Sequence, residues 1–135
     1  MTLKTKEMKY YINKKVEGSF DEVIVQVTEA LQQEGFGVLT EMDIQQKLKE
    51  KLDVDFRRYK ILGACNPRFA YQALESEDKI GTMLPCNVVV QELDSGGIEV
   101  AAVNPVASMQ AVENDDLFCI STEILRKLER VIASL

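Results

Sequence analysis

The chain has 135 residues, of which 46% are apolar and 28% are charged. This length is typical of one domain with its own hydrophobic core, and the composition excludes a disordered or fibrous chain. The net charge is −6: residues 1–68 hold 12 basic and 11 acidic side chains, whereas residues 69–135 hold 4 and 11. The basic stripe of a nucleic-acid-binding surface is missing, so we expect no nucleic-acid partner. Residues 1–135 are expected to form a single domain, with a core from about residue 9 to residue 133.

The same sequence contains no apolar stretch that approaches the roughly 20 residues needed by a membrane-spanning helix. Its lysine-bearing start is not followed by the apolar run of a secretory signal. The cysteines are odd in number and widely spaced, which does not form a disulfide framework. These features predict a cytoplasmic protein that does not enter a membrane.

Strand and helix patterns alternate along the chain. Ser19 and Glu22 have the spacing of a capping box, which predicts a helix that begins there and ends at Gly35. Asp43 and the Asn66–Pro67 pair are typical residues for the start of two further helices. Strands are expected at 8–16, 36–42, 59–64, 88–90 and 98–103, and the later helices at 43–52, 67–74 and 114–135.

A loop with two glycines, residues 94–97, separates the last two expected strands and predicts a hairpin. The element order is then strand, helix, strand, helix, strand, helix, hairpin and long helix. Short connections and a hairpin favour a mostly antiparallel sheet with helices packed on it. The expected fold class is α+β in a single domain.

Histidine is absent from the chain. Its absence excludes Ser-His-Asp and Cys-His catalysis and the usual zinc sites. Chemistry in this protein would therefore depend on thiols, carboxylates, lysines or tyrosines.

Cys65 and Cys86 are the sharpest candidates for such chemistry. Cys65 immediately precedes the Asn66–Pro67 helix start, where backbone amides and the helix dipole favour a thiolate. Cys86 and Asn87 form a second Cys-Asn pair at the start of a strand. If the sheet brings these strand ends together, the two thiols and the two amides would share one corner of the molecule. The alternative is that the cysteines are small buried apolar groups and the asparagines are cap or turn residues.

Two further features carry weaker signals. Glu41 and Asp43 lie two residues apart at the end of an expected strand, so both carboxylates would lie on one face and could hold a cation or serve acid–base chemistry. The alternative is that Asp43 simply caps the next helix. Cys119 lies off the apolar stripe of the last helix, so we expect it to be exposed or at a subunit contact.

Three segments resemble a known family. They are Gly35–Asp43, Ile61–Pro67 and Leu84–Val90, and in this order they are similar to the bacterial and archaeal family named domain of unknown function 302. The likeness extends from about Lys9 to Val131. The motif residues fall here on Glu41, Asp43, Cys65, Asn66, Pro67, Pro85, Cys86 and Asn87.

The resemblance implies a β-α-β4-α arrangement of the TATA-binding-protein-like type, and a homodimer. It implies no activity, because none is established for the family. The name of the fold does not imply DNA binding, since fold does not dictate function.

Three hypotheses for the function remain open. The first is a homodimeric binding module that takes a small ligand or a soft metal ion near Cys65, Asn66, Cys86 and Asn87, with Glu41 and Asp43 as further candidates. Copper(I) or zinc would suit two thiolates, although a tetrahedral site would need more ligands. The second is a thiol-dependent or redox enzyme in which Cys65 is the nucleophile and Cys86 resolves it. The third is a structural dimer without a ligand site.

Overall fold

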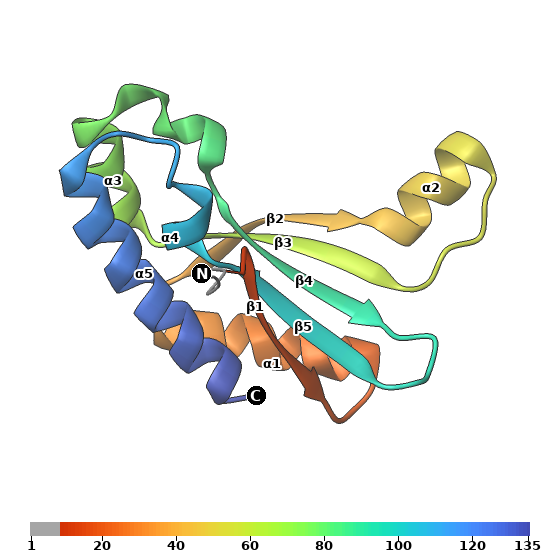
Figure 1. Ribbon diagram of the computed structural model, residues 1–135. Coiled ribbons are helices and arrows are strands. Elements are labelled where there is room, and N and C mark those ends of the chain that lie inside the picture. Colours follow the sequence, from red (N-terminus) through yellow and green to blue (C-terminus); the bar gives the residue numbers. More distant parts are fainter. Residues whose placement is uncertain (1–8) are drawn as a thin grey trace, which may run out of the picture.

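The computed structural model describes residues 9–135, and its centre is a five-stranded sheet (Figure 1). The strand order is β1-β5-β4-β3-β2, and every neighbouring pair is antiparallel. The α+β class with an antiparallel sheet, expected from the sequence, is confirmed. The strands are β1 (Tyr11–Val16), β2 (Gly37–Asp43), β3 (Tyr59–Cys65), β4 (Cys86–Glu92) and β5 (Ile98–Val103).

Two helices, α1 (Phe20–Gln33) and α5 (Asp115–Ala133), cover one face of this sheet. Helix α1 begins at the expected capping box, in which the Glu22 amide donates to the Ser19 hydroxyl and the Ser19 amide donates to the Glu22 carboxylate. Its buried residues repeat at helical spacing, as an amphipathic helix on a sheet requires. Gly35 follows with φ of +88°, a left-handed conformation that favours glycine.

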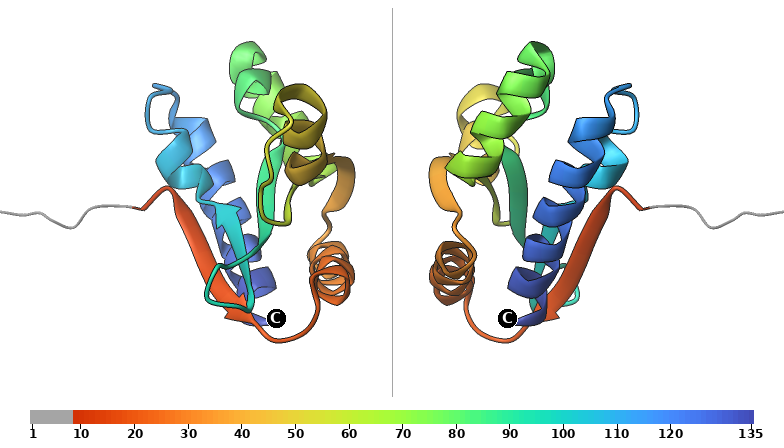
Figure 2. Two further views of the ribbon diagram at one scale, coloured as in Figure 1. Left: turned by 90° about the vertical axis from the view of Figure 1, so that its right-hand side faces the viewer. Right: turned by 90° about the vertical axis from the view of Figure 1, so that its left-hand side faces the viewer.

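The other helices are insertions into the arrangement formed by the five strands, α1 and α5. They are α2 (Ile44–Leu52), α3 (Pro67–Ser76), the 3-10 helix η2 (Asp78–Met83) and α4 (Pro105–Ser108). Without them the order is β-α-β4-α. Figure 2 shows α3 beside the first half of α5, with which it is in contact. The sequence pattern did not predict α4, which is only one turn long and begins at the Asn104 cap.

Side-chain alternation in β4 divides the sheet into two faces. Val88 and Val90 are fully buried beneath the helices, in the same core cluster as Leu62, Val100 and Leu128. Val89, between them, points to the opposite side because successive strand residues alternate. One face is therefore closed by α1 and α5.

We call the opposite side the open sheet face, since no helix between residues 9 and 135 packs on it. Cross-strand register and alternation assign it apolar and polar side chains from all five strands. They are Tyr11, Asn13, Lys15, Thr40, Met42, Tyr59, Ile61, Gly63, Asn87, Val89, Gln91, Glu99, Ala101 and Val103.

The β2–α2–β3 arm extends away from the other helices, with α2 at its far end (Figure 1). Helix α2 contributes no buried residue, and Leu52 is 65% exposed. Its side chains form surface ion pairs, such as Lys49 with Asp53 at 3.1 Å. In residues 9–135 no helix has the length and apolar character to cross a membrane.

Candidate functional site

Cys65 and Cys86 line the same pocket. Cys65 is the last residue of β3 and Cys86 is the first residue of β4, and the register pairs Cys86 with Ala64, the neighbour of Cys65. Both cysteines are free thiols, Cys65 half-buried and Cys86 buried. The two cysteines, 21 positions apart in the sequence, are therefore brought together by the β3–β4 pairing.

The pocket between them is small and has apolar walls. We call it the two-thiol pocket, and its other walls include Phe36, Phe69, Leu84 and Ile124. The cavity is partly open to solvent and measures about 30 Å³, and the empty space including its mouth is about 420 Å³. A cavity of this size holds one water-sized group. The cavity thus admits only the narrow end of a molecule.

Burial raises the pKa of Cys86 to about 11, and repulsion from Cys65 adds to this effect. The Cys86 sulfur therefore keeps its proton at neutral pH. Because a thiol is a poor nucleophile compared with a thiolate, Cys86 is not the group that attacks first. That role is left to Cys65, the more accessible of the two.

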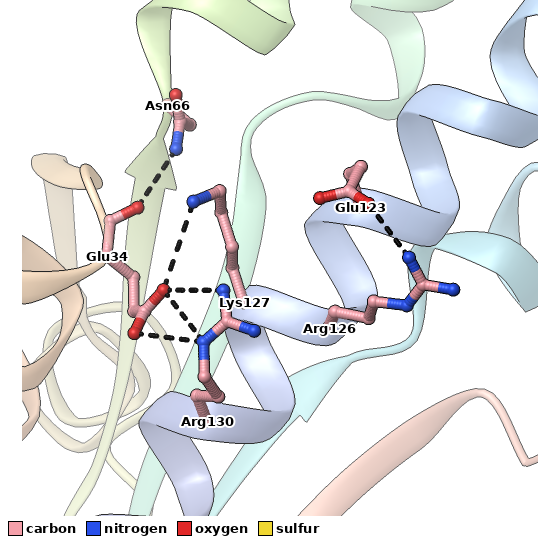
Figure 3. A network of polar contacts seen from close by, with 6 residues as sticks. All are labelled: Glu34, Asn66, Glu123, Arg126, Lys127 and Arg130. Carbon is pink, nitrogen blue, oxygen red and sulfur yellow. Dashed lines mark hydrogen bonds and ion pairs between the residues drawn. The ribbon is translucent and has the colours of Figure 1, made fainter.

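Asn66 contributes to the pocket in a way that the sequence pattern did not predict. It occupies the N-cap position of α3, but its side chain caps no amide of that helix. Instead its Nδ2 donates to the Glu34 carbonyl oxygen at 3.1 Å (Figure 3). A Cβ on Gly35 would lie 3.1 Å from this Nδ2, so glycine is needed for both its positive φ and the close approach. The first turn of α3 is thereby left without a side-chain cap, next to Cys65.

A network of charged groups continues from Asn66 to α5. The Glu34 carboxylate accepts hydrogen bonds from Arg130, with Arg130 Nη2 to Oε1 at 2.9 Å, and Lys127 lies 3.9 Å from it (Figure 3). Hydrogen bonds from Arg130 lower the pKa of Glu34. The Lys127 ammonium also lies 5.8 Å from the centre of the Phe69 ring. The network ties the end of α1 and the start of α3 to α5. Helices α3 and α5 both contribute to the wall of the two-thiol pocket.

Asn87 does not share this pocket, which corrects the expectation of a common corner. It follows Cys86 directly within β4, so alternation turns its side chain to the open sheet face. There it lies with Thr40, Pro85 and Ile61 along a shallow groove. A Cys-Asn pair within a strand cannot direct both side chains into one pocket, because adjacent strand residues point to opposite faces.

Glu41 and Asp43 also lie along that groove, on the edge strand β2. Glu41 forms an ion pair with Lys60, with Oε1 2.7 Å from Nζ. Asp43 accepts a hydrogen bond from the Gln46 amide at 3.0 Å, which is the N-cap of α2. Both carboxylates thus have structural partners, and Asp43 follows the capping alternative.

No group of three or more cysteine, aspartate or glutamate side chains within residues 9–135 is arranged to hold a metal ion. Cys119 is exposed on α5 and lies outside the two-thiol pocket. A metal at this pocket would have two sulfurs from one chain and would need its other ligands from elsewhere.

The pocket wall and its reverse side also contain residues that the sequence pattern did not indicate. Ser121 lies there, 3% exposed, and its hydroxyl donates to the Phe118 carbonyl at 3.1 Å. Gly63 lies on the reverse side, where an added Cβ would meet Thr40 Oγ1 and Pro85 Cγ. Helical spacing placed Ile120 and Ile124 on an apolar stripe, but no sequence signal indicated that this stripe faces Cys86.

The chain is similar to a protein of known structure. A crystal structure of an uncharacterized conserved DUF302 protein from Bacillus stearothermophilus is similar, with a TM-score of 0.87 and 29% identity. The alignment covers 93% of this chain and 98% of that one. No match was found among curated proteins. The model of the family described as Domain of unknown function DUF302 matches residues 12–135. The chain therefore belongs to the DUF302 family.

Proposed function

We propose that this protein is a homodimeric binding module that takes a small ligand into the two-thiol pocket. The observation that carries the proposal is the small apolar cavity between Cys65 and Cys86. Small-molecule sites are typically apolar clefts with a few polar groups that converge on the ligand. Here the polar groups are the two thiols and the uncapped first turn of α3.

The dimensions of the cavity restrict the ligand. Since the cavity is about 30 Å³, only a group the size of a methyl, a thiol or a terminal oxygen enters it. The rest of the ligand lies in the mouth, between Asn66, Phe69 and Ala70. A soft metal ion is the less supported occupant, because two sulfurs alone do not complete a tetrahedral site.

Mass spectrometry under native conditions, on protein purified from its own cell, tests this proposal. We expect the wild-type protein to carry an added mass, with metal content measured in the same sample. Ala70→Leu would fill the mouth and abolish the added mass. Ala133→Leu, on an exposed residue at the end of α5, is the matched control and keeps it. An added mass that survives Ala70→Leu, or none in the wild type, contradicts the proposal.

The proposed dimer uses the open sheet face. A continuous apolar run such as Val88–Val90 is typical of a strand buried on both sides, whereas helices cover one side only. The strand residues of this face include one cation, Lys15, and one anion, Glu99, which are register partners. Arg57 adds a further cation, since its Nε donates to Gln91 of this face at 2.8 Å. Two chains of net charge −6 therefore meet with less repulsion through this face than through an acidic surface.

The oligomeric state in solution tests the dimer. Ala101→Glu places an unpaired carboxylate at the centre of the face and should give a monomer in light scattering coupled to gel filtration. Val25→Glu, on an exposed residue of α1, adds the same charge and should leave the dimer intact. The proposed dimer is contradicted if the wild-type protein is a monomer, or if the Ala101→Glu variant is still a dimer. We also propose that the protein resides in the cytoplasm, where free thiols persist.

A second function, thiol chemistry, is favoured by the position of the two sulfurs on one pocket. Cys65 would be the nucleophile and Cys86 the resolving thiol. The rate of Cys65 alkylation as a function of pH, measured in a Cys119→Ser background, distinguishes the two functions. A slow rate that follows an ordinary thiol ionisation near about 8.5 counts against thiol chemistry.

A further inference from the structure

We infer that the two-thiol pocket reduces small hydroperoxides, and that Cys65 and Cys86 become an intramolecular disulfide in the reaction. This inference rests on the thiol chemistry proposed above and names its substrate class. It does not depend on whether the resting protein carries a ligand.

The β3–β4 register brings the Cα atoms of Cys65 and Cys86 within the span of a disulfide. Cys86 is paired with Ala64, so Cys65 is offset by one residue on the neighbouring strand. The distance between neighbouring strands and the rise per residue along a strand together place the Cα atoms of Cys65 and Cys86 about 6 Å apart. This separation lies within the Cα–Cα range of known disulfides. Successive strand side chains diverge, but β3 ends at Cys65 and the chain turns there into α3. Its side chain consequently lines the same pocket as Cys86.

The surroundings of the two cysteines differ in the way that this reaction needs. Cys65 is half-buried, at the mouth, next to amides of α3 that Asn66 leaves uncapped. Negative charge is favoured at such a helix start, and α3 has ten residues. Cys86 is 9% exposed, and within residues 9–135 its sulfur has no hydrogen-bond partner, although its backbone is paired with Ala64 in the sheet. It is therefore an unpartnered thiol directed into the cavity, protected from solvent oxidants.

The cavity selects the oxidant by size. About 30 Å³ receives the terminal oxygen of a hydroperoxide, whereas each half of an organic disulfide such as oxidised glutathione is too large for it and would stay in the mouth. The apolar walls exclude further water from the reacting sulfur. A peroxide is accordingly the oxidant class for this pocket.

The chemistry balances in two steps. The Cys65 thiolate attacks the distal peroxide oxygen, an S–O bond forms, the O–O bond breaks, and the alkoxide leaves and takes up the thiol proton as an alcohol. Cys65 is now a sulfenic acid, oxidised by two electrons, and the peroxide is reduced. The Cys86 sulfur then attacks the Cys65 sulfur, the S–S bond forms, the S–O bond breaks, and the hydroxyl leaves with the Cys86 proton as water. The sum is two thiols and a hydroperoxide to a disulfide, an alcohol and water.

The test is treatment of the full reduced protein with one equivalent of hydrogen peroxide, followed by peptide mapping. We expect a Cys65–Cys86 linked peptide, a loss of two hydrogens from the intact mass, and a Cys119 that can still be alkylated. Cys119 is an exposed internal reference, and Cys65 should be converted to the disulfide at least about tenfold faster than Cys119 is oxidised, because Cys86 shares its pocket. Cys119→Ser should change neither the product nor the rate.

Two variants separate the steps. Cys86→Ser should stop the reaction at a Cys65 sulfenic acid, which a carbon-acid probe such as dimedone traps. Cys65→Ser should abolish the fast reaction and leave the Cys86 thiol intact, with circular dichroism to verify folding. If Cys65→Ser does not fold, the test rests on Cys86→Ser alone: a dimedone adduct on Cys65 supports the inference, and the lack of an adduct contradicts it.

Three results would overturn the inference: equal oxidation of Cys65 and Cys119, a linkage between chains in place of the internal disulfide, or faster oxidation by glutathione disulfide than by hydrogen peroxide at equal concentration. Native mass spectrometry of the reduced protein is a separate readout. A bound ligand without peroxide reactivity would contradict this inference alone. Peroxide reactivity without a bound ligand would contradict only the ligand proposal.

Discussion

The two faces of the sheet differ in what covers them, although the same strands form both. On one face Val88, Val90 and Val100 are fully buried beneath α1 and α5. On the other face Val89 and Ala101 are only half-buried, and no helix of residues 9–135 packs there. The covered face holds the two-thiol pocket, and the open face holds Asn87, Val89 and Ala101. Adjacent residues of one strand thus belong to different sites: one faces the candidate chemical site and the next faces the candidate subunit contact.

The largest expected difference between the two faces is in stability, when a charge is placed at one or the other of two adjacent positions in β4. Val90→Asp puts an unpaired carboxylate into a fully buried position, and we expect a loss of more than about 4 kcal/mol, close to complete unfolding. Val89→Asp should change the unfolding free energy of the monomer by about 1 kcal/mol or less. Chemical denaturation followed by circular dichroism measures both. Equal losses would show that the faces are energetically alike.

The cysteine on the covered face should give a pH signature. Burial raises the folded-state pKa of Cys86 to about 11, above the value of about 8.5 in an unfolded chain. The unfolded state therefore loses this proton first, so stability that is fully present below about pH 8.5 falls as the pH rises toward 11. We expect a loss of about 2–3 kcal/mol across this window that Cys86→Ala removes. The exposed Cys119→Ala is the control, and its curve should follow that of the wild type.

The open face is also constrained, at the end near β2. A Cβ on Gly63 would lie 2.8 Å from Pro85 Cγ and closer still to Thr40 Oγ1. Gly63→Ala should cost about 1–3 kcal/mol of unfolding free energy, the usual cost of overpacking. Thr40→Ala in the same chain should recover part of it. Gly37→Ala, whose Cβ meets nothing within 4 Å, is the matched control with little effect, and a similar loss there would discount the steric explanation.

The smallest expected effect concerns the ion pair that closes the covered face. Glu34→Gln should lower the unfolding free energy at neutral pH by about 1 kcal/mol, as for a bidentate pair near the surface. Arg130 lowers the folded-state pKa of Glu34, so this stability is present above the ordinary carboxyl pKa and is lost as the pH falls through the lowered value. The difference between variant and wild type should therefore vanish in acid. Glu29→Gln, exposed on α1, should show no such pH dependence.

Much of the fold could be predicted from local sequence. The capping box at Ser19, the turn at Gly35 and the cap at Asp43 all formed as expected, because each depends on residues within one helical turn. The family, too, followed from three short motifs. The candidate site was harder to predict: the two thiols and the two amides were expected to share one corner if the strand ends meet, and Cys65, Asn66 and Cys86 line one pocket while Asn87 lies outside it.

By itself the sequence determined the element types, the antiparallel α+β class, and the two cysteines at strand termini, since these follow from contacts between near neighbours in the chain. Only the tertiary structure decided that Ala64 pairs with Cys86, that Asn66 donates to Glu34 in place of capping α3, and that no helix of residues 9–135 packs on one face of the sheet. Register and helix packing bring together residues that are distant in the chain, and a shift of one position would turn each side chain to the other face. For that reason the two-thiol pocket is a property of the fold and not of either Cys-Asn motif.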